Sequence, residues 1–316
     1  MKQELEIPVY LLTGFLDGGK SRFIKNTLQE PYFNDGAKTL VILTEEGEEE
    51  FPEELLKSVN AELLTADDFE ELTPSFFKEA YETHRPDRVI IEYNGMWSVP
   101  DFMAIDLPSG LICYQVITIL DGSAFQLYLN NIRMTAMTLL TNTDMVIFNR
   151  CGKDTDLALY QRTVRSVNSR CDIVFEDEKG NELECPEPDL PYSIEEQEIV
   201  ITDENYGTFY IDLSEHPERY IDKDITMLVQ VMKNKMFPDN MFVGGRRAMT
   251  CCAADIRFLP YIFIYRDAKS VKARSFAEVT AALKWEFHEG YQEEGPVFYV
   301  KSLTLSERPK DELIYF

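Results

Sequence analysis

The chain carries one motif that dictates the fold around it. Residues 14–21 read GFLDGGKS and match the pattern G-x-x-x-x-G-K-[ST]. An apolar run at 7–12 precedes the motif, and residues 22–29 follow with a helical pattern. A strand, a glycine-rich loop and a helix in this order form the local structure that binds nucleotide phosphates, and a chance Gly-Lys-Ser turn is the alternative. We therefore expect a nucleotide-binding α/β domain.

Each fixed position of this motif has a physical role. Glycines allow backbone angles and close approaches that a side chain would block, so that successive N–H groups can point at an anion. The positive end of the following helix adds to this attraction. Lys20 is expected to reach the β- and γ-phosphates, and the Ser21 hydroxyl is expected to bind Mg²⁺. The nucleotide-binding residues predicted from this segment are Gly14, Asp17, Gly18, Gly19, Lys20, Ser21 and Arg22.

Acidic residues follow two further predicted strands. The segment KTLVILT leads into Glu45 and Glu46, and the segment RVIIE ends in Glu92. In a parallel α/β sheet, the carboxyl ends of the strands face the ligand. We expect Glu92 to anchor the water shell of Mg²⁺ and the Gly95 N–H to contact the γ-phosphate. Glu45 or Glu46 would position Mg²⁺ or the attacking water, although both also suit the first turn of a solvated helix. The predicted catalytic residues are Lys20, Glu45, Glu46 and Glu92.

Predicted strands alternate with predicted helices through residue 175. Apolar runs typical of buried strands lie at 113–120, 144–148 and 172–175, and helical patterns separate them. This alternation predicts an α/β fold, a P-loop NTPase domain over residues 1–175 with a doubly wound, mostly parallel sheet. Residues 176–204 are charged and rich in proline, without a helical or strand period, so we interpret them as a linker.

Residues 205–316 have a β-rich pattern. Turn signals such as Pro238-Asp239-Asn240 and Glu294-Gly295-Pro296 separate short apolar runs. Short strands over a segment of this length indicate a small β-rich domain, either a sandwich or a five-stranded Greek-key barrel. The predicted strands are 207–213, 225–231, 241–243, 249–254, 261–265, 276–282 and 297–303.

The charge is strongly negative and uneven along the chain. The net charge is −25, and residues 1–221 hold 17 basic and 43 acidic side chains, whereas residues 222–316 hold 14 and 13. A chain this acidic repels nucleic acid and anionic membranes over long range, so neither is an expected partner. Cations, including metal ions, are favoured, and solubility accounts for most of these charges.

The apolar runs and the six cysteines indicate the compartment. No apolar run in the sequence approaches the length of a membrane span, and the first ten residues lack the charged-then-apolar pattern of a signal peptide. We therefore expect a cytoplasmic protein that is not an integral membrane protein. In that compartment the cysteines are expected to be thiols or metal ligands rather than disulfides.

Three ordered segments carry a family resemblance. They are GFLDGGKS after PVYLLT, then VIIEYNGMWSVP, then ITILDG before a long helical pattern. Over residues 5–175 they resemble the CobW-like branch of the CobW/HypB/UreG GTPases, which shows TGFLGAGKTT-type, ETTG-type and VDA-type segments at these places. The resemblance implies a metal-linked P-loop GTPase that binds GTP and Mg²⁺ and takes part in the delivery of zinc, cobalt or nickel.

The chain departs from the family pattern at two places. The family's Cys-x-Cys-Cys metal motif is missing, because residues 45–87 contain no cysteine. The guanine-reading Asn-Lys-x-Asp motif is represented by Asn149-Arg150-Cys151-Gly152. Asn149 is kept and Arg150 is similar to the lysine, so both are predicted to bind the nucleotide, but Gly152 replaces the aspartate. Asp154, two positions further on, could take over that role, and GTP is expected ahead of ATP.

The last part of the chain has a resemblance of its own. The segment FVGGRRAMTCCAAD and the ending RPKDELIYF resemble the C-terminal domain of YcgQ-type bacterial proteins over residues 205–316. Those proteins are paired with a permease and have been linked to zinc supply. Cys251 and Cys252 are therefore candidate Zn²⁺ ligands, and the alternative is one buried and one exposed strand cysteine. Arg246 and Arg247 are expected to meet the acidic first domain, or a phosphate.

Three functional hypotheses follow. The first is a GTPase of low intrinsic turnover that acts as a switch or metallochaperone in metal supply or metalloenzyme maturation. Its partners would be a client metalloprotein or a permease, and the family implies a homodimer. The second is a nucleotide-binding scaffold with little or no hydrolysis, and the third is an ATP-dependent kinase. The predicted metal ligands are Ser21 and Glu92 for Mg²⁺ and Cys251 and Cys252 for Zn²⁺.

Overall fold

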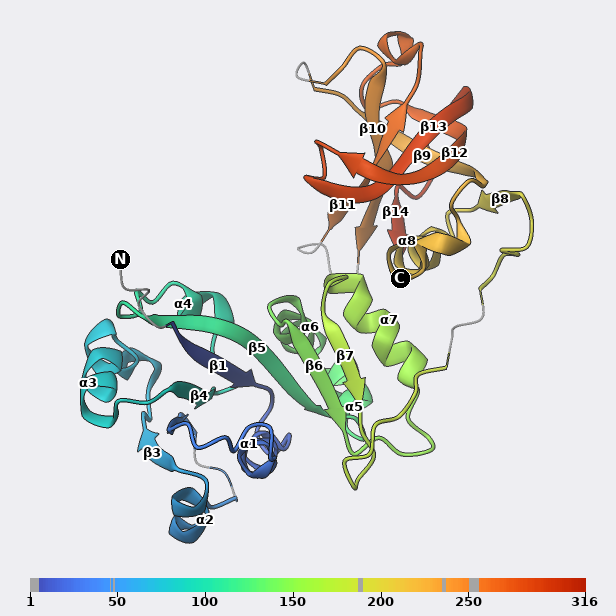
Figure 1. Cartoon of the computed structure of the whole chain (residues 1–316). Coiled ribbons are helices and arrows are strands. Elements are labelled where there is room, and N and C mark those ends of the chain that lie inside the picture. Colours follow the sequence, from blue (N-terminus) through green and yellow to red (C-terminus); the bar gives the residue numbers. More distant parts are fainter. Residues whose placement is uncertain (1–5, 46, 48, 187–189, 235–236, 250–255) are drawn as a thin grey trace. The chain divides into compact units, whose positions relative to one another are not determined.

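The computed structural model describes residues 6–316 except 46, 48, 187–189, 235–236 and 250–255. The chain divides into two compact units, Met1–Pro186 and Glu187–Phe316 (Figure 1). Each unit contains one seven-stranded sheet.

The first unit is built on a parallel sheet, which confirms the predicted α/β class. Its seven strands are hydrogen-bonded in the order β3-β2-β4-β1-β5-β6-β7, and every neighbouring pair is parallel. Strand β1 lies in the middle, with β4 on one side and β5 on the other (Figure 1). The strands are β1 Ile7–Thr13, β2 Thr39–Leu43, β3 Ala61–Thr65, β4 Arg88–Glu92, β5 Leu111–Asp121, β6 Met145–Asn149 and β7 Asp172–Phe175.

Helices connect these parallel strands. Two of these connections contain a break between helical segments. Ile132 leaves helical geometry and divides the segment 123–141 into α5 and α6. Pro74 starts α3 after a short 3₁₀ turn, since a proline ring cannot continue a preceding helix. The helices are α1 Lys20–Gln29, α2 Glu53–Ser58, η1 Phe69–Glu71, α3 Pro74–His84, α4 Val99–Met103, α5 Phe125–Asn131, α6 Arg133–Thr141 and α7 Leu157–Val167.

Both faces of this sheet are buried, which explains why its strands are apolar without alternation. Val9 and Leu11 of β1 join a buried cluster that contains Phe77 of α3. Leu12 joins a different cluster, which contains Ile24 of α1. Successive strand residues point to opposite faces, so the two clusters cover the two faces of a doubly wound sheet.

The second unit contains a closed five-stranded barrel. Strands β10, β11, β13, β12 and β9 are neighbours in this order, and β9 also pairs with β10. Pairing is antiparallel except between β11 and β13. The barrel, one of the two predicted β-rich architectures, is confirmed. The strands are β8 Glu198–Ile201, β9 Asp224–Met232, β10 Met241–Met249, β11 Arg257–Ile264, β12 Phe276–His288, β13 Glu293–Ser306 and β14 Leu313–Tyr315.

Two sequence expectations for the secondary structure of this unit were wrong. Residues 207–213 lie in helix α8 (Tyr206–Glu215) instead of a strand, and its buried Tyr206, Phe209 and Leu213 have helical spacing. The expected turn at 294–296 lies inside β13.

The remaining helical turns are η2 Pro217–Arg219 and η4 Ala268–Ser270. Among the helices of the described ranges, none combines the length and the apolar character that crossing a bilayer requires.

Arg246 of β10 does not have the surface role predicted for it. Its side chain is 0% exposed and forms an ion pair with Asp203. Its Nη2 also donates to the Asp311 carbonyl oxygen at 3.4 Å. The guanidinium is therefore used inside the second unit, where it joins the segment before α8 to the C-terminal segment.

Three phenylalanine rings form the centre of the barrel core. The rings of Phe242 and Phe263 stack with centroids 5.1 Å apart, and Phe263 stacks on Phe298 at 5.0 Å. All three side chains are fully buried. Phe263 lies between the other two rings, so its removal would leave a cavity with two unsupported neighbours.

We expect Phe263→Ala to lower the free energy of unfolding of the barrel by about 3–5 kcal/mol, because the substitution leaves a cavity in a close-packed core. Urea unfolding would be followed by the fluorescence of Trp285 in β12, in a Trp97→Phe background that removes the other of the two tryptophans. Phe287→Ala is the matched control, because that ring is 63% exposed. The control should change stability by less than about 0.5 kcal/mol. Equal effects of the two substitutions would contradict the described core.

Candidate functional site

The predicted phosphate-binding loop connects the end of β1 to the start of α1. Helix α1 begins at Lys20, and Gly19 caps it with a φ of 100°. Gly14 has a φ of 137°, and a Cβ there would lie 2.0 Å from the Ile119 carbonyl oxygen. A side chain is therefore excluded at Gly14 both by conformation and by space.

Gly95, after the end of β4, lies directly against this loop. A Cβ at Gly95 would be 2.1 Å from the carbonyl oxygen of Gly14 and 3.2 Å from the Phe15 nitrogen. The backbone segment after β4 and the phosphate-binding loop are thus in direct contact, with no space for a side chain between them at Gly95. This contact places Gly95 beside the loop, and the contact of its N–H with the γ-phosphate stays a prediction.

The Lys20 ammonium group occupies the mouth of the loop. It donates to the carbonyl oxygens of Gly14 and Phe15 at 2.8 and 3.0 Å, and it forms an ion pair with Glu45. Lys20 is only 3% exposed. A buried ammonium needs such acceptors, and phosphate oxygens can replace them when a nucleotide binds.

A solvent-open pocket of about 390 Å³ surrounds this ammonium group. Its walls come from the loop, from α1, from the segment after β2 and from the ends of β4 and β6. The structure therefore brings most of the predicted phosphate and metal residues together. The lining residues are Leu16, Asp17, Gly19, Lys20, Ser21, Arg22, Glu45, Gly47, Glu49, Glu92 and Arg150.

Glu92 is a buried carboxylate beside Ser21. The Ser21 hydroxyl donates to Glu92 Oε1 at 2.7 Å, and Glu92 Oε2 is buried without a hydrogen-bond partner. Burial raises the pKa of Glu92 above its ordinary value, although the Ser21 hydrogen bond and the nearby Lys20 act in the opposite direction. A buried oxygen without a partner is costly, so this carboxylate is suited to a ligand that satisfies it.

These residues fit Mg²⁺. The ion prefers oxygen ligands, keeps several waters and is commonly held by one or two protein oxygens together with phosphates. Ser21 would offer its hydroxyl oxygen, and the unpartnered Glu92 Oε2 would accept hydrogen bonds from metal-bound water.

Thr44 connects the ends of β2 and β4 behind this pocket. Its hydroxyl donates to the Glu92 carbonyl oxygen at 3.0 Å and accepts from the Asn94 N–H at 2.8 Å. Thr44 is 2% exposed. This buried hydroxyl sets Glu45 and Glu92 side by side, although they lie 47 positions apart in the sequence.

Asn149 and Arg150 contact the phosphate-binding loop from the end of β6. Asn149 Nδ2 donates to the Gly18 carbonyl oxygen at 2.8 Å. Arg150 Nη1 donates to the Asp17 carbonyl oxygen at 3.0 Å and to Asp121 Oδ2 at 2.7 Å. Asp121 was not among the predicted site residues. Its position at the carboxyl end of β5 could have identified it as a candidate.

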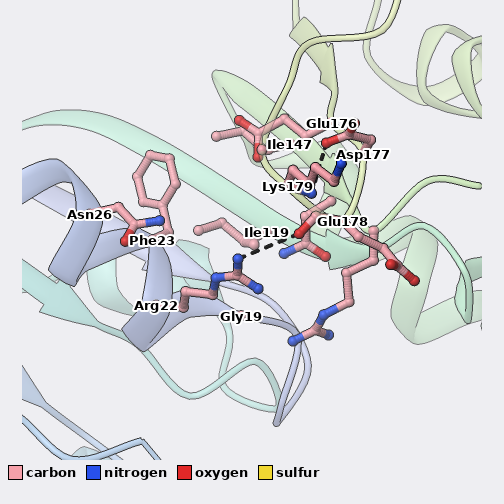
Figure 2. Close-up of a pocket in the computed structure, with 13 residues that line it drawn as sticks. Gly19, Arg22, Phe23, Asn26, Ile119, Ile147, Glu176, Asp177, Glu178 and Lys179 are labelled. Carbon is pink, nitrogen blue, oxygen red and sulfur yellow. Dashed lines mark hydrogen bonds between the residues drawn. The ribbon is translucent and has the colours of Figure 1, made fainter.

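A second cavity, of about 60 Å³, lies beside Asn149 and was missed by sequence reasoning (Figure 2). The loop Glu176–Gly180 forms one wall, and the Arg22 guanidinium donates to the Glu178 carbonyl oxygen at 3.5 Å. These residues were assigned to the linker. The sequence did contain a hint, since these residues directly follow the predicted strand at 172–175. The carboxyl ends of parallel strands lie at one edge of the sheet, so residues after this strand could have been expected near the ligand.

Three predicted site residues lie outside the described residues: Glu46, Cys251 and Cys252. Within the described ranges, no three His, Cys, Asp or Glu side chains are grouped in a way that would hold a metal ion. Burial raises the pKa of the Cys113, Cys151 and Cys171 thiols to about 11. These three thiols are therefore protonated near neutral pH; Cys151 and Cys171 are buried, and Cys113 is partly buried.

Two family models match the chain. The nucleotide-binding domain of CobW/HypB/UreG matches residues 8–175, and the DUF1980 C-terminal domain matches residues 184–316. A curated relative, the zinc chaperone CobW of a Sinorhizobium species, is 32% identical over 136 residues. That match covers 38% of this chain and 38% of the relative, so the chain spans well under half of that protein.

Solved structures show weaker similarity. The Zn(II)-bound YjiA GTPase from E. coli is 14% identical, with a TM-score of 0.43 over 86% of this chain and 92% of that one. The hydrogenase maturation factor HypB from Archaeoglobus fulgidus is 15% identical, with a TM-score of 0.41 over 56% of this chain and 84% of that one. Neither similarity is high enough to locate individual residues. The match to residues 8–175 covers more than half of the sequence, and it agrees with the loop geometry. The chain therefore belongs to the CobW/HypB/UreG family and carries its nucleotide-binding domain.

Proposed function

We propose that the first unit binds GTP with Mg²⁺ and hydrolyses it slowly, as a switch in metal supply or metalloenzyme maturation. The observation that carries this proposal is one pocket that holds the buried Lys20 ammonium, the Ser21 hydroxyl and the unpartnered Glu92 oxygen. These are the groups that a nucleoside triphosphate and its metal ion require. Mg²⁺ would neutralise part of the phosphate charge when bound.

Glu45 has a defined part in this proposal. Its carboxylate pairs with Lys20 and must release it when the γ-phosphate arrives. The freed carboxylate would then lie close to the phosphate, where it can orient a water molecule for attack. Binding of a triphosphate would thereby change the segment after β2, which is how nucleotide state can be passed to a partner.

Slow turnover follows from the fixed cations of the pocket. Lys20, Arg22 and Arg150 line it, and Arg150 is paired with Asp121 and with the loop backbone. Arg22 contacts the Glu178 carbonyl oxygen, so both arginines of the pocket already have partners. Added positive charge gives the largest accelerations of phosphoryl transfer, and we assign no arginine of this chain to that role. A partner or a second copy of the chain would supply that charge.

Zinc is the metal that we propose as cargo. The support is the similarity to a zinc chaperone, together with the acidic net charge of −25. We further propose Cys251 and Cys252 as metal ligands, and a division of labour between the nucleotide domain at 1–175 and the domain at 205–316, joined by residues 176–204. The second domain would contact a client metalloprotein or a permease, in the cytoplasm.

A nucleotide-binding scaffold without hydrolysis is the second candidate. Gly152 stands where the family carries its guanine-reading aspartate, and residues 45–87 lack the family's cysteine motif. Both changes are compatible with a domain that keeps nucleotide binding but has lost catalysis.

We expect Lys20→Ala to abolish GTP hydrolysis and to weaken GTP binding at least tenfold, because the substitution removes the buried cation that contacts the phosphates. Phosphate release and calorimetric titration of the full chain would measure the two effects. Lys57→Ala is the matched control, since that side chain is 77% exposed on α2. Wild-type turnover no higher than that of the Lys20→Ala variant would favour the scaffold over the GTPase.

We expect Glu92→Gln to stabilise the Mg²⁺-free chain increasingly as the pH rises. The pKa of Glu92 is raised in the folded protein, so ionising it costs folding free energy. That cost is absent below the ordinary pKa of about 4.5, grows between this value and the raised pKa of the folded protein, and stays constant above it. Urea unfolding between pH 4 and pH 8 measures the difference.

Glu79→Gln, an exposed carboxylate on α3, provides the baseline for this series. A Glu92→Gln difference that shrinks as the pH rises would show that the carboxylate is not held in a desolvated site.

We expect GTP and Zn²⁺ to alter each other's affinity for the full chain by the same factor, because coupling between two binding sites is reciprocal. Calorimetry would titrate the metal-free protein with Zn²⁺ in the absence and presence of GTP and Mg²⁺, and then with GTP at fixed Zn²⁺. Zinc affinity that ignores the nucleotide would remove the metal switch from the proposal and leave nucleotide binding intact.

A further inference from the structure

The family's means of recognising guanine is missing from its usual place. Guanine presents two adjacent donors, its ring N1–H and its 2-amino group, and one carboxylate can accept from both. Gly152 occupies the position of the family's aspartate, and a Cβ there would meet nothing within 4 Å. Base recognition therefore needs an acceptor from another part of the chain.

The second cavity has the position that a base would need. It shares Gly19, Arg22 and Arg150 with the pocket around Lys20, so the two cavities adjoin at the start of α1. A nucleotide with its phosphates at Lys20 can extend from one into the other. Phe23, Ile119 and Ile147 supply apolar surface, and the Glu176–Gly180 loop supplies a polar wall, a combination that suits a planar heteroaromatic ring (Figure 2).

Three acidic residues of that loop line the cavity, and two of them are unsuited to the task. Asp177 uses both carboxylate oxygens within the loop, where it accepts from the N–H groups of Lys179 and Asn181 and from the Asn181 side chain. Glu178 is exposed. Glu176 is half-buried, and among the described residues its carboxylate has no hydrogen-bond or ion-pair partner.

The backbone holds Glu176 beside the strand end that carries Asn149. Its N–H donates to the Phe148 carbonyl oxygen at 2.8 Å, and its carbonyl oxygen accepts from the Cys151 N–H at 2.8 Å. Asn149 Nδ2 is engaged with the Gly18 carbonyl oxygen, and Asn149 Oδ1 is buried without a hydrogen-bond partner. That single amide oxygen does not offer the two acceptor oxygens of a carboxylate. Burial, and then the nearby Glu182, raise the pKa of Glu176, as expected for a carboxylate that lacks a donor in the unliganded chain.

We propose that Glu176 reads the guanine base by accepting hydrogen bonds from its N1–H and 2-amino groups, in place of the acidic residue that Gly152 replaces. This inference rests on the proposed nucleotide-binding function. Adenine lacks this pair of adjacent donors, so the carboxylate selects guanine nucleotides. The specificity is thus supplied from the strand end of β7 rather than from that of β6.

The test is Glu176→Gln in the full chain, with calorimetric titration of GDP, ADP and the xanthine nucleotide XDP in the presence of Mg²⁺. The amide keeps one acceptor for the ring N1–H and offers a donor where xanthine carries an oxygen in place of the 2-amino group. We expect GDP affinity to fall tenfold or more, and XDP affinity to rise above that of the wild type. A gain of XDP binding cannot arise from misfolding.

Two further variants sharpen the test. Glu184→Gln changes an exposed glutamate outside the cavity and should retain the wild-type order of affinities. Asp154→Asn tests the other acidic residue considered for this role. A Glu176→Gln chain that keeps the wild-type ratio of GDP to XDP affinity, or an Asp154→Asn chain that inverts it, would overturn the inference while wild-type GDP binding upholds the proposed function. A wild-type chain that binds none of the three diphosphates would overturn both.

Discussion

The first unit depends on the close approach of three backbone segments around Gly14. The carbonyl oxygen of Ile119 leaves no room for a side chain at Gly14, and the carbonyl oxygen of Gly14 leaves none at Gly95. The contact locks the ends of β1, β4 and β5 together, and the loop, the Lys20 ammonium and the Glu92 carboxylate take their positions from it. A phosphate site made of backbone N–H groups has to be rigid, because the direction of each N–H is fixed by the conformation of the whole loop.

The two main charged groups of the site have partners that a nucleotide and its metal ion could replace or complete. Lys20 is held by two carbonyl oxygens and by Glu45, all of which phosphate oxygens can replace. Glu92 keeps one buried oxygen without a donor, and burial raises its pKa. One buried carboxylate oxygen of this site therefore lacks a donor that metal-bound water could supply. A nucleotide that binds with its metal ion is for this reason expected to stabilise the folded first unit.

The second unit is stabilised by different means. A closed barrel removes sheet edges, and the stacked rings of Phe242, Phe263 and Phe298 fill its centre. Arg246, which the sequence suggested would contact the acidic first domain or a phosphate, is buried in this unit and forms an ion pair with Asp203. The two cysteines proposed as metal ligands, Cys251 and Cys252, lie outside the described residues.

The sequence by itself determined the phosphate-binding loop, the parallel α/β sheet and the acidic strand ends at Glu45 and Glu92. These features depend on local patterns, namely glycine spacing, apolar runs and the residue that ends each strand. Only the tertiary structure decided that Lys20 pairs with Glu45, that Arg150 is engaged by Asp121, and that the segment after β7 lies beside the phosphate loop. Parallel pairing joins segments that are far apart in the chain, and no local pattern encodes which strand ends meet. Helix α8 was predicted as a strand because a short apolar run is compatible with either a strand or a buried helix. Packing of this segment in the second unit decides for the helix.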